Sequence, residues 1–113
     1  MRERSAHRVV PAKPVTVALE HPKKPLAYGV VANISECGGC VLTAGKFDVG
    51  EEVVLTLSFA REAQPIETPG RIIWINQGPS GTVQYGLKFD TTFDTHIRLK
   101  QLIGNFADEP SDG

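Results

Sequence analysis

The sequence is poor in cysteine, methionine and aromatic residues. It has two cysteines and one methionine, and 7% of its residues are aromatic. At 113 residues, one domain can bury roughly two-thirds of its unfolded-chain surface and fold without disulfides. No apolar run reaches the about 20 residues of a membrane-spanning helix, and no apolar stretch follows the first arginines as in a secretory signal. We therefore expect a reduced, cytoplasmic protein without membrane insertion.

Basic residues are unevenly spread along the chain. Residues 1–25 carry six basic and two acidic residues, a net charge of +4, whereas residues 26–113 carry six basic and eleven acidic ones, a net charge of −5. A basic segment on an acidic body favours an anionic ligand near the N-terminus, although a solvated tail fits these charges equally well. Pro11 and Pro14 discourage regular structure, so we predict a flexible basic arm over residues 1–12.

Short segments of alternating apolar residues follow the arm. Residues 52–59 place an apolar side chain at every second position, which is typical of a half-buried strand. The same period puts Ile72 and Trp74 on one face of a later strand. We expect Trp74 in the core or at the rim of the fold, and the alternative is that it lines a ligand pocket. We predict strands over residues 15–19, 27–32, 40–43, 52–59, 66–75 and 82–89.

The pattern changes to that of a helix between Thr92 and Phe106. Its apolar residues, beginning at Phe93 and Ile97, suit a helix packed on a sheet, and Thr92 or Asp94 could cap its start. Six short strands and one helix predict a small antiparallel barrel or sandwich over residues 13–107. Residues 108–113 are acidic and rich in turn formers, and we predict a frayed tail there.

Two stretches carry side chains suited to binding. Arg4 and Arg8 offer two planar guanidinium groups that match phosphate oxygens or the O6/N7 edge of a guanine. Between two predicted strands, residues 33–39 hold Asn33, Ser35 and two glycines, which permit positive φ and close backbone approach. The alternative is a tight hairpin in which Asn33 and Ser35 satisfy the turn's own backbone.

Taken together, Arg-x-x-x-Arg in an arm and Asn-x-Ser-x-x-Gly-Gly about 25 residues later resemble the PilZ domain family. Residues 70–74 (Gly-Arg-Ile-Ile-Trp) and 85–89 (Tyr-Gly-Leu-Lys-Phe) look like later strands of that family, so the resemblance covers nearly the whole chain. It implies a mainly all-β fold, a six-stranded antiparallel β-barrel with a C-terminal α-helix. It also implies cyclic di-GMP as ligand and no cofactor.

The resemblance further implies which residues bind. In the family the two arginines engage phosphates and guanine edges, and the Asn/Asp-x-Ser-x-x-Gly strand contacts a guanine. Asn in place of the commoner Asp keeps an acceptor but loses a charge, which is expected to weaken binding. Glu3, before the first arginine, should disfavour a second nucleotide, so we expect one per chain. The implied ligand residues are Arg4, Arg8, Asn33, Ser35, Gly38 and Gly39.

The Cys37-x-x-Cys40 spacing is also that of zinc and redox sites. A tetrahedral zinc needs two more ligands, and the sequence has no second pair of cysteines, while its three histidines are scattered singly. A redox C-x-x-C normally opens a helix, whereas this one lies between predicted strands. We therefore predict no metal site and no disulfide.

The sequence leaves four functions to compare. The first is a non-catalytic cyclic di-GMP receptor whose shape change docks it on a protein effector in motility, exopolysaccharide or biofilm signalling. The second is a PilZ-like adaptor that binds a protein partner but no nucleotide. A single-stranded nucleic-acid binder would want a basic groove with stacking aromatics, and the body of this chain is acidic. An enzyme is disfavoured because no nucleophile–base pair or metal cluster is evident.

Overall fold

The computed structural model describes residues 10–107 except 12, 61 and 79, so most of the predicted arm and all of the predicted tail lie outside the described residues. Within the described part, the strands begin and end close to the predicted bounds. They are β1 (Val15–His21), β2 (Lys24–Ser35), β3 (Gly38–Thr43), β4 (Glu52–Phe59), β5 (Ile66–Gln77) and β6 (Val83–Phe89), followed by α1 (Phe93–Ala107).

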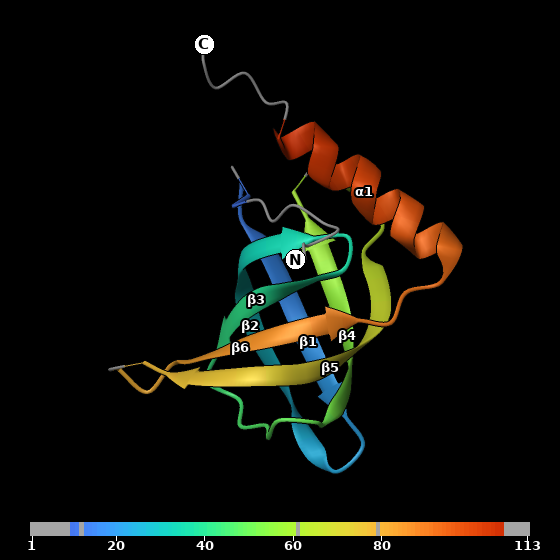
Figure 1. Ribbon diagram of the computed structural model, residues 1–113. Coiled ribbons are helices and arrows are strands. Elements are labelled where there is room, and N and C mark those ends of the chain that lie inside the picture. The colour runs from blue at the N-terminus through green and yellow to red at the C-terminus, as the bar shows by residue number, and fades with distance from the viewer. Residues whose placement is uncertain (1–9, 12, 61, 79, 108–113) are drawn as a thin grey trace, which may run out of the picture.

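The six strands close into an antiparallel barrel in the order β1-β2-β3-β6-β5-β4 (Figure 1). Closure comes from the pairing of β1 with both β2 and β4, and of β6 with both β3 and β5. The predicted six-stranded β-barrel with a C-terminal helix is confirmed, and the barrel rather than the sandwich is correct. Closure pairs every strand on both sides and so removes exposed sheet edges.

Alternation along the strands fills the inside of the barrel. In β4 every second residue is buried, and Leu55 and Leu57 are fully enclosed, as the period of two predicts. In β6 the residues that face inward include Tyr85 and Leu87, which are also buried. Burying such side chains contributes roughly 1.5–3 kcal/mol each, so this core is the main source of stability.

The alternation breaks within β5. The pairing of β5 with β6 shifts between Ile72 and Trp74, so a bulge turns the second half of the strand. Ile72 is fully buried, whereas Ile73 and Trp74 are 42% and 37% exposed. The prediction that Ile72 and Trp74 share a face is therefore wrong, and Trp74 lies on the outer wall instead of in the core.

Helix α1 lies over one end of the barrel (Figure 1), and Leu99, Leu102 and Ile103 join the core. The Thr92 hydroxyl accepts a bond from the backbone N–H of Thr95 at 3.2 Å, which confirms one of the two predicted caps. Phe93 and Ile97 were expected to face the sheet and are exposed instead. At about 100° per residue, Ile97 points about 160° away from Leu99, so both cannot reach the barrel.

The opposite end of the barrel is closed by the β3–β4 loop. Phe47 is 5% exposed, and its ring packs edge-on against Tyr85 with 5.6 Å between centroids. The Tyr85 hydroxyl accepts from the backbone N–H of Phe47 at 3.0 Å and donates to the carbonyl of Gly45 at 2.8 Å. Both ends of the barrel are thus covered, and binding surfaces must lie on the outside.

Candidate functional site

The predicted hairpin begins a row of residues that crosses five strands on the outer wall. Ser35 pairs with Gly38, Gly38 with Lys88, Lys88 with Arg71, and Arg71 with Glu52. Directly opposite residues of antiparallel strands point to the same face, and the exposed Lys88 and Arg71 show that this face is the outer one. We call these five residues the first row.

A second row lies two residues further along the strands. Asn33 pairs with Cys40, Cys40 with Gly86, and Gly86 with Trp74. A Cβ built on Gly86 would lie 2.2 Å from the indole nitrogen of Trp74, so the indole ring covers this glycine. The two rows together bring Asn33 and Ser35 onto one wall with Lys88 and Trp74, which are more than 35 residues away in the sequence.

The hairpin is tighter than the sequence suggested. The strands extend into the motif, with β2 ending at Ser35 and β3 starting at Gly38, so only Glu36 and Cys37 form the loop. The Ser35 hydroxyl accepts from the backbone N–H of Cys37 at 3.1 Å and donates to the carbonyl of Gly38 at 3.3 Å. Ser35 is 2% exposed, so its hydroxyl holds the hairpin in the way the alternative interpretation described.

Gly38 and Gly39 serve close packing of the strands. A Cβ on Gly38 would lie 2.2 Å from the carbonyl oxygen of Leu87, and one on Gly39 would lie 2.6 Å from that of Asn33. Among the described glycines, only Gly50 and Gly81 have positive φ, so the positive φ considered for the hairpin glycines is not adopted. The close backbone approach is present, and it is to neighbouring strands.

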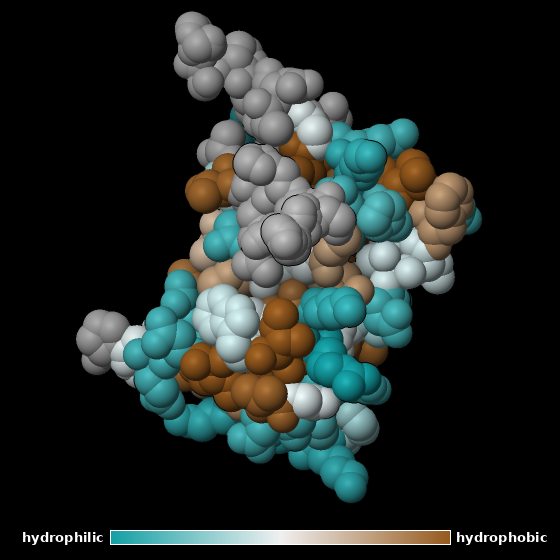
Figure 2. Space-filling view, in the orientation of Figure 1, coloured by the Kyte–Doolittle hydropathy of each residue, from teal (hydrophilic) through white to brown (hydrophobic). Residues whose placement is uncertain are grey.

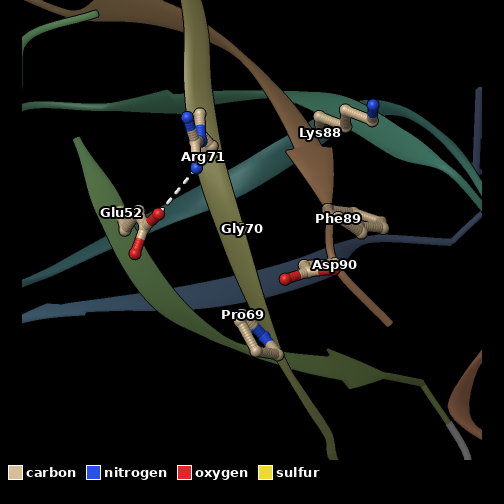
Figure 3. Close-up of a pocket in the computed structure, with 7 residues that line it drawn as sticks. All are labelled: Glu52, Pro69, Gly70, Arg71, Lys88, Phe89 and Asp90. Atoms are coloured by element: carbon tan, nitrogen blue, oxygen red, sulfur yellow. Dashed lines mark hydrogen bonds and ion pairs between the residues drawn. The ribbon is translucent and has the colours of Figure 1, made fainter. Parts of the chain in front are cut away.

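The two cations of the first row differ in their partners. Arg71 donates to Glu52 across 2.7 Å, in an ion pair whose side chains are 58% and 71% exposed. Within the described residues, the Lys88 ammonium makes no hydrogen bond or ion pair. Both line a cavity of about 310 Å³ on the outer wall (Figure 3), together with Glu52, Pro69, Gly70, Phe89 and Asp90.

The wall that faces the viewer in Figure 2 also carries apolar surface, framed by hydrophilic residues. On β5 the exposed apolar residues are Ile73 and Trp74, and on β2 Val30 is 45% exposed. Such a mixture of aromatic, apolar and cationic groups suits a planar, charged ligand that stacks on one side.

The two cysteines of the Cys37-x-x-Cys40 spacing differ in exposure. Cys37 is exposed and Cys40 is buried, and neither is in a disulfide. Among the described residues, no three or more His, Cys, Asp or Glu side chains lie together so that they could hold a metal ion. No helix within this part of the chain is long and apolar enough to cross a membrane.

Comparison with known proteins identifies the family. The family model for the PilZ domain matches residues 2–106. The chain belongs to the PilZ domain family. No curated protein sequence matches the chain.

Solved PilZ structures share the fold at low sequence identity. The PilZ domain with c-di-GMP of YcgR from Escherichia coli is 11% identical with a TM-score of 0.80, over 96% of this chain and 94% of that one. The Bacillus subtilis inhibitor of motility MotI/DgrA is 21% identical with a TM-score of 0.75, over 93% and 51%. The MrkH–c-di-GMP complex of K. pneumonia is 14% identical with a TM-score of 0.79, over 98% and 55%. The chain therefore spans about half the length of MotI and of MrkH.

The PilZ barrel brings four of the six predicted ligand residues together. Asn33, Ser35, Gly38 and Gly39 all lie in the β2–β3 hairpin, with Asn33 half-buried. Arg4 and Arg8 lie outside the described residues, so their role stays a prediction. Sequence reasoning gave no role to Lys88, which the structure sets opposite Gly38. Its only signal was membership of the segment 85–89, because no local pattern fixes the register of β3 against β6.

Proposed function

We propose that this PilZ domain is a cytoplasmic receptor for cyclic di-GMP that performs no catalysis. The observation that carries the proposal is the combination of a PilZ match over residues 2–106 with an Asn-x-Ser-x-x-Gly-Gly motif that forms the β2–β3 hairpin, in which Asn33, Ser35 and Gly38 belong to the rows of the outer wall. Solved structures of the same fold include the YcgR PilZ domain with c-di-GMP and the MrkH–c-di-GMP complex.

The chemical type of each predicted residue indicates which part of the ligand it would contact. Arg4 and Arg8 would bind the phosphates and guanine edges of the dinucleotide as bidentate donors. Asn33 would accept or donate at a guanine edge, and Gly38 and Gly39 would act by letting the neighbouring strands approach closely and so holding the hairpin beside the base. Because Ser35 already bonds within the hairpin, it would act mainly by fixing the shape that the guanine meets.

Binding would then be converted into a signal by the arm. Ordering a segment costs roughly 1–2 kcal/mol per residue, so residues 1–12 would close only when the ligand supplies enough contacts. The closed arm and the ligand together form a new surface, on which a protein effector in motility, exopolysaccharide or biofilm signalling would dock.

Calorimetric titration of the chain with cyclic di-GMP, GTP and a short single-stranded oligonucleotide tests the proposal. We expect heat with cyclic di-GMP alone, about one nucleotide per chain, and binding lost or sharply weakened in Arg4→Ala and Arg8→Ala. Lys100→Ala is the matched control, because it removes an exposed cation from α1. Heat with the oligonucleotide would contradict the receptor, and no heat with any ligand would favour an adaptor that binds protein only.

Two further measurements complete the test. Ser35→Ala should weaken binding while lowering thermal stability, since it removes both hairpin bonds of the hydroxyl. Chromatography of the nucleotide after long incubation should recover it intact. Hydrolysed nucleotide would show an enzyme in place of a receptor.

A further inference from the structure

Lys88 lies on the outer wall next to the predicted site but is not one of the predicted ligand residues. It projects from β6 directly opposite Gly38 of the hairpin, and the two residues face the same side of the wall. Lys88 is exposed, and no described residue forms an ion pair with its ammonium group. In Figure 3 its side chain points away from the Arg71–Glu52 pair.

The distance across the strands puts the hairpin within reach of this ammonium. Directly opposite residues in an antiparallel pair have Cα atoms about 4.5–5.5 Å apart. Gly38 carries no side chain, so this position adds no side-chain atom between the lysine and a molecule lying over the hairpin. A ligand that lies over the hairpin therefore comes next to a flexible four-carbon stem that ends in a positive charge.

The charges around Lys88 make it the cation that is available to such a ligand. Arg71, the next cation of the first row, is held by Glu52 at 2.7 Å. The backbone N–H of Asp90 donates to the carbonyl of Pro69 in β5 at 2.8 Å, so Asp90 lies beside β5, on the side of β6 that faces away from β3 and the hairpin glycine. A ligand anion over the hairpin would meet the ammonium of Lys88 before it meets any other described cation of the row.

We infer that Lys88 is a ligand-binding residue of this PilZ domain and that its ammonium pairs with a phosphate of the cyclic dinucleotide. This inference rests on the proposed function, because it adds a contact to the same ligand. A phosphate is the group chosen because Lys acts as a compact point charge, which suits a phosphate oxygen better than the two-acceptor edge of guanine that arginine grips. Lys88 would thus supply a cation from the rigid barrel, beside the two arginines of the arm.

Titration with cyclic di-GMP of wild type, Lys88→Gln, Lys88→Arg and Lys100→Gln at two salt concentrations tests this inference. We expect Lys88→Gln to raise Kd about tenfold, as for a lost charge-assisted bond, and to weaken the dependence of Kd on salt. Lys88→Arg keeps the charge and should stay within about threefold of wild type. Lys100→Gln makes the same charge change on α1 and should bind as wild type does.

The outcomes separate the two proposals. Binding by wild type with an unchanged Kd in Lys88→Gln overturns the role of Lys88 and leaves the receptor standing. A tenfold loss whose salt dependence equals that of wild type overturns the phosphate contact. Absence of binding by wild type overturns the receptor and this inference together. Because Lys88 is exposed, all variants should unfold at the wild-type temperature, which circular dichroism checks.

Discussion

Gly38 sits where any side chain would strike a neighbouring strand. The space that a methyl group would need is filled by the carbonyl oxygen of Leu87 at 2.2 Å. That oxygen belongs to the backbone of β6 and cannot swing aside as the end of a long side chain can. The glycine therefore sets how closely β3 and β6 approach, and with it the position of the hairpin.

Gly38→Ala should consequently destabilise the protein by at least about 2 kcal/mol, because the two strands must move apart to admit the methyl group. Gly104→Ala is the matched control. Its added Cβ meets nothing within 4 Å, and alanine in a helix is favoured over glycine by about 0.5–1 kcal/mol. Urea unfolding followed by circular dichroism measures both changes. Equal effects of the two substitutions would contradict the steric explanation.

Tyr85 is a buried residue whose hydroxyl serves two backbone groups of the β3–β4 loop. Tyr85→Phe would leave the N–H of Phe47 and the carbonyl of Gly45 without this partner. Unpaired buried polar groups cost about 1–3 kcal/mol, so we expect a loss of that size in the free energy of unfolding. Tyr28→Phe removes a hydroxyl from a side chain that is 70% exposed and should change stability by less than about 0.5 kcal/mol.

At the scale of elements, the β3–β4 loop is fastened by Glu51. Its carboxylate accepts from the Lys24 ammonium at 2.6 Å and from the backbone N–H of Asp48 at 2.9 Å, and it lies 3.4 Å from His21. The hydrogen bond from Lys24, followed by that from Asp48, lowers the pKa of Glu51 below its usual 4.5. The charged carboxylate is therefore favoured by the fold.

Because of this lowered pKa, the Glu51 carboxylate contributes to the free energy of unfolding over a defined pH range. This contribution is fully present above the unfolded-state pKa of about 4.5 and is lost as pH falls through the lower folded-state pKa. The difference in Tm between wild type and Glu51→Gln should therefore be largest near neutral pH and shrink from pH 5 to pH 3. Thermal unfolding at several pH values measures it. A difference that stays constant over this range would argue against the role of the charge.

The elements were predictable to different degrees. Strand β4 followed from the sequence alone because its strict period of two has no competing interpretation. The bulge after Ile72 could not be foreseen, since it depends on how β5 fits beside β6. The exposure of Phe93 could not be foreseen either. The end of the barrel is covered by Leu99 and its apolar neighbours on α1, so Phe93 is left on the outer side of the helix.

The candidate site divides in the same way. Asn33 and Ser35 stand in one continuous motif, so the sequence could bring them together. Lys88 and Trp74 reach the same wall only through the pairing of β6 with β3 and β5, which is a long-range property of the fold. Local patterns predict which residues form a strand, and they do not predict which strand lies beside it.

For the whole molecule, the receptor proposal predicts stabilisation by the ligand. A ligand at 100 times its Kd adds about 2.7 kcal/mol to the free energy of unfolding if it binds the folded state only. For a domain of about 100 residues that corresponds to roughly 10–20 °C in Tm. We expect this shift in wild type with cyclic di-GMP and its absence in Arg8→Ala at the same concentration. An unchanged Tm at saturating ligand would contradict binding to the folded state.

The closed barrel limits how a partner can approach this protein. Each of the six strands has a neighbour on both sides, so its ladder of backbone N–H and C=O groups is occupied along the paired stretches. Along these stretches a partner cannot dock by adding a strand of its own, as proteins with an open sheet allow. A partner would then recognise the protein through its side chains and through the exposed groups of a bound ligand. The ligand-bound and ligand-free forms would therefore offer a partner chemically different surfaces.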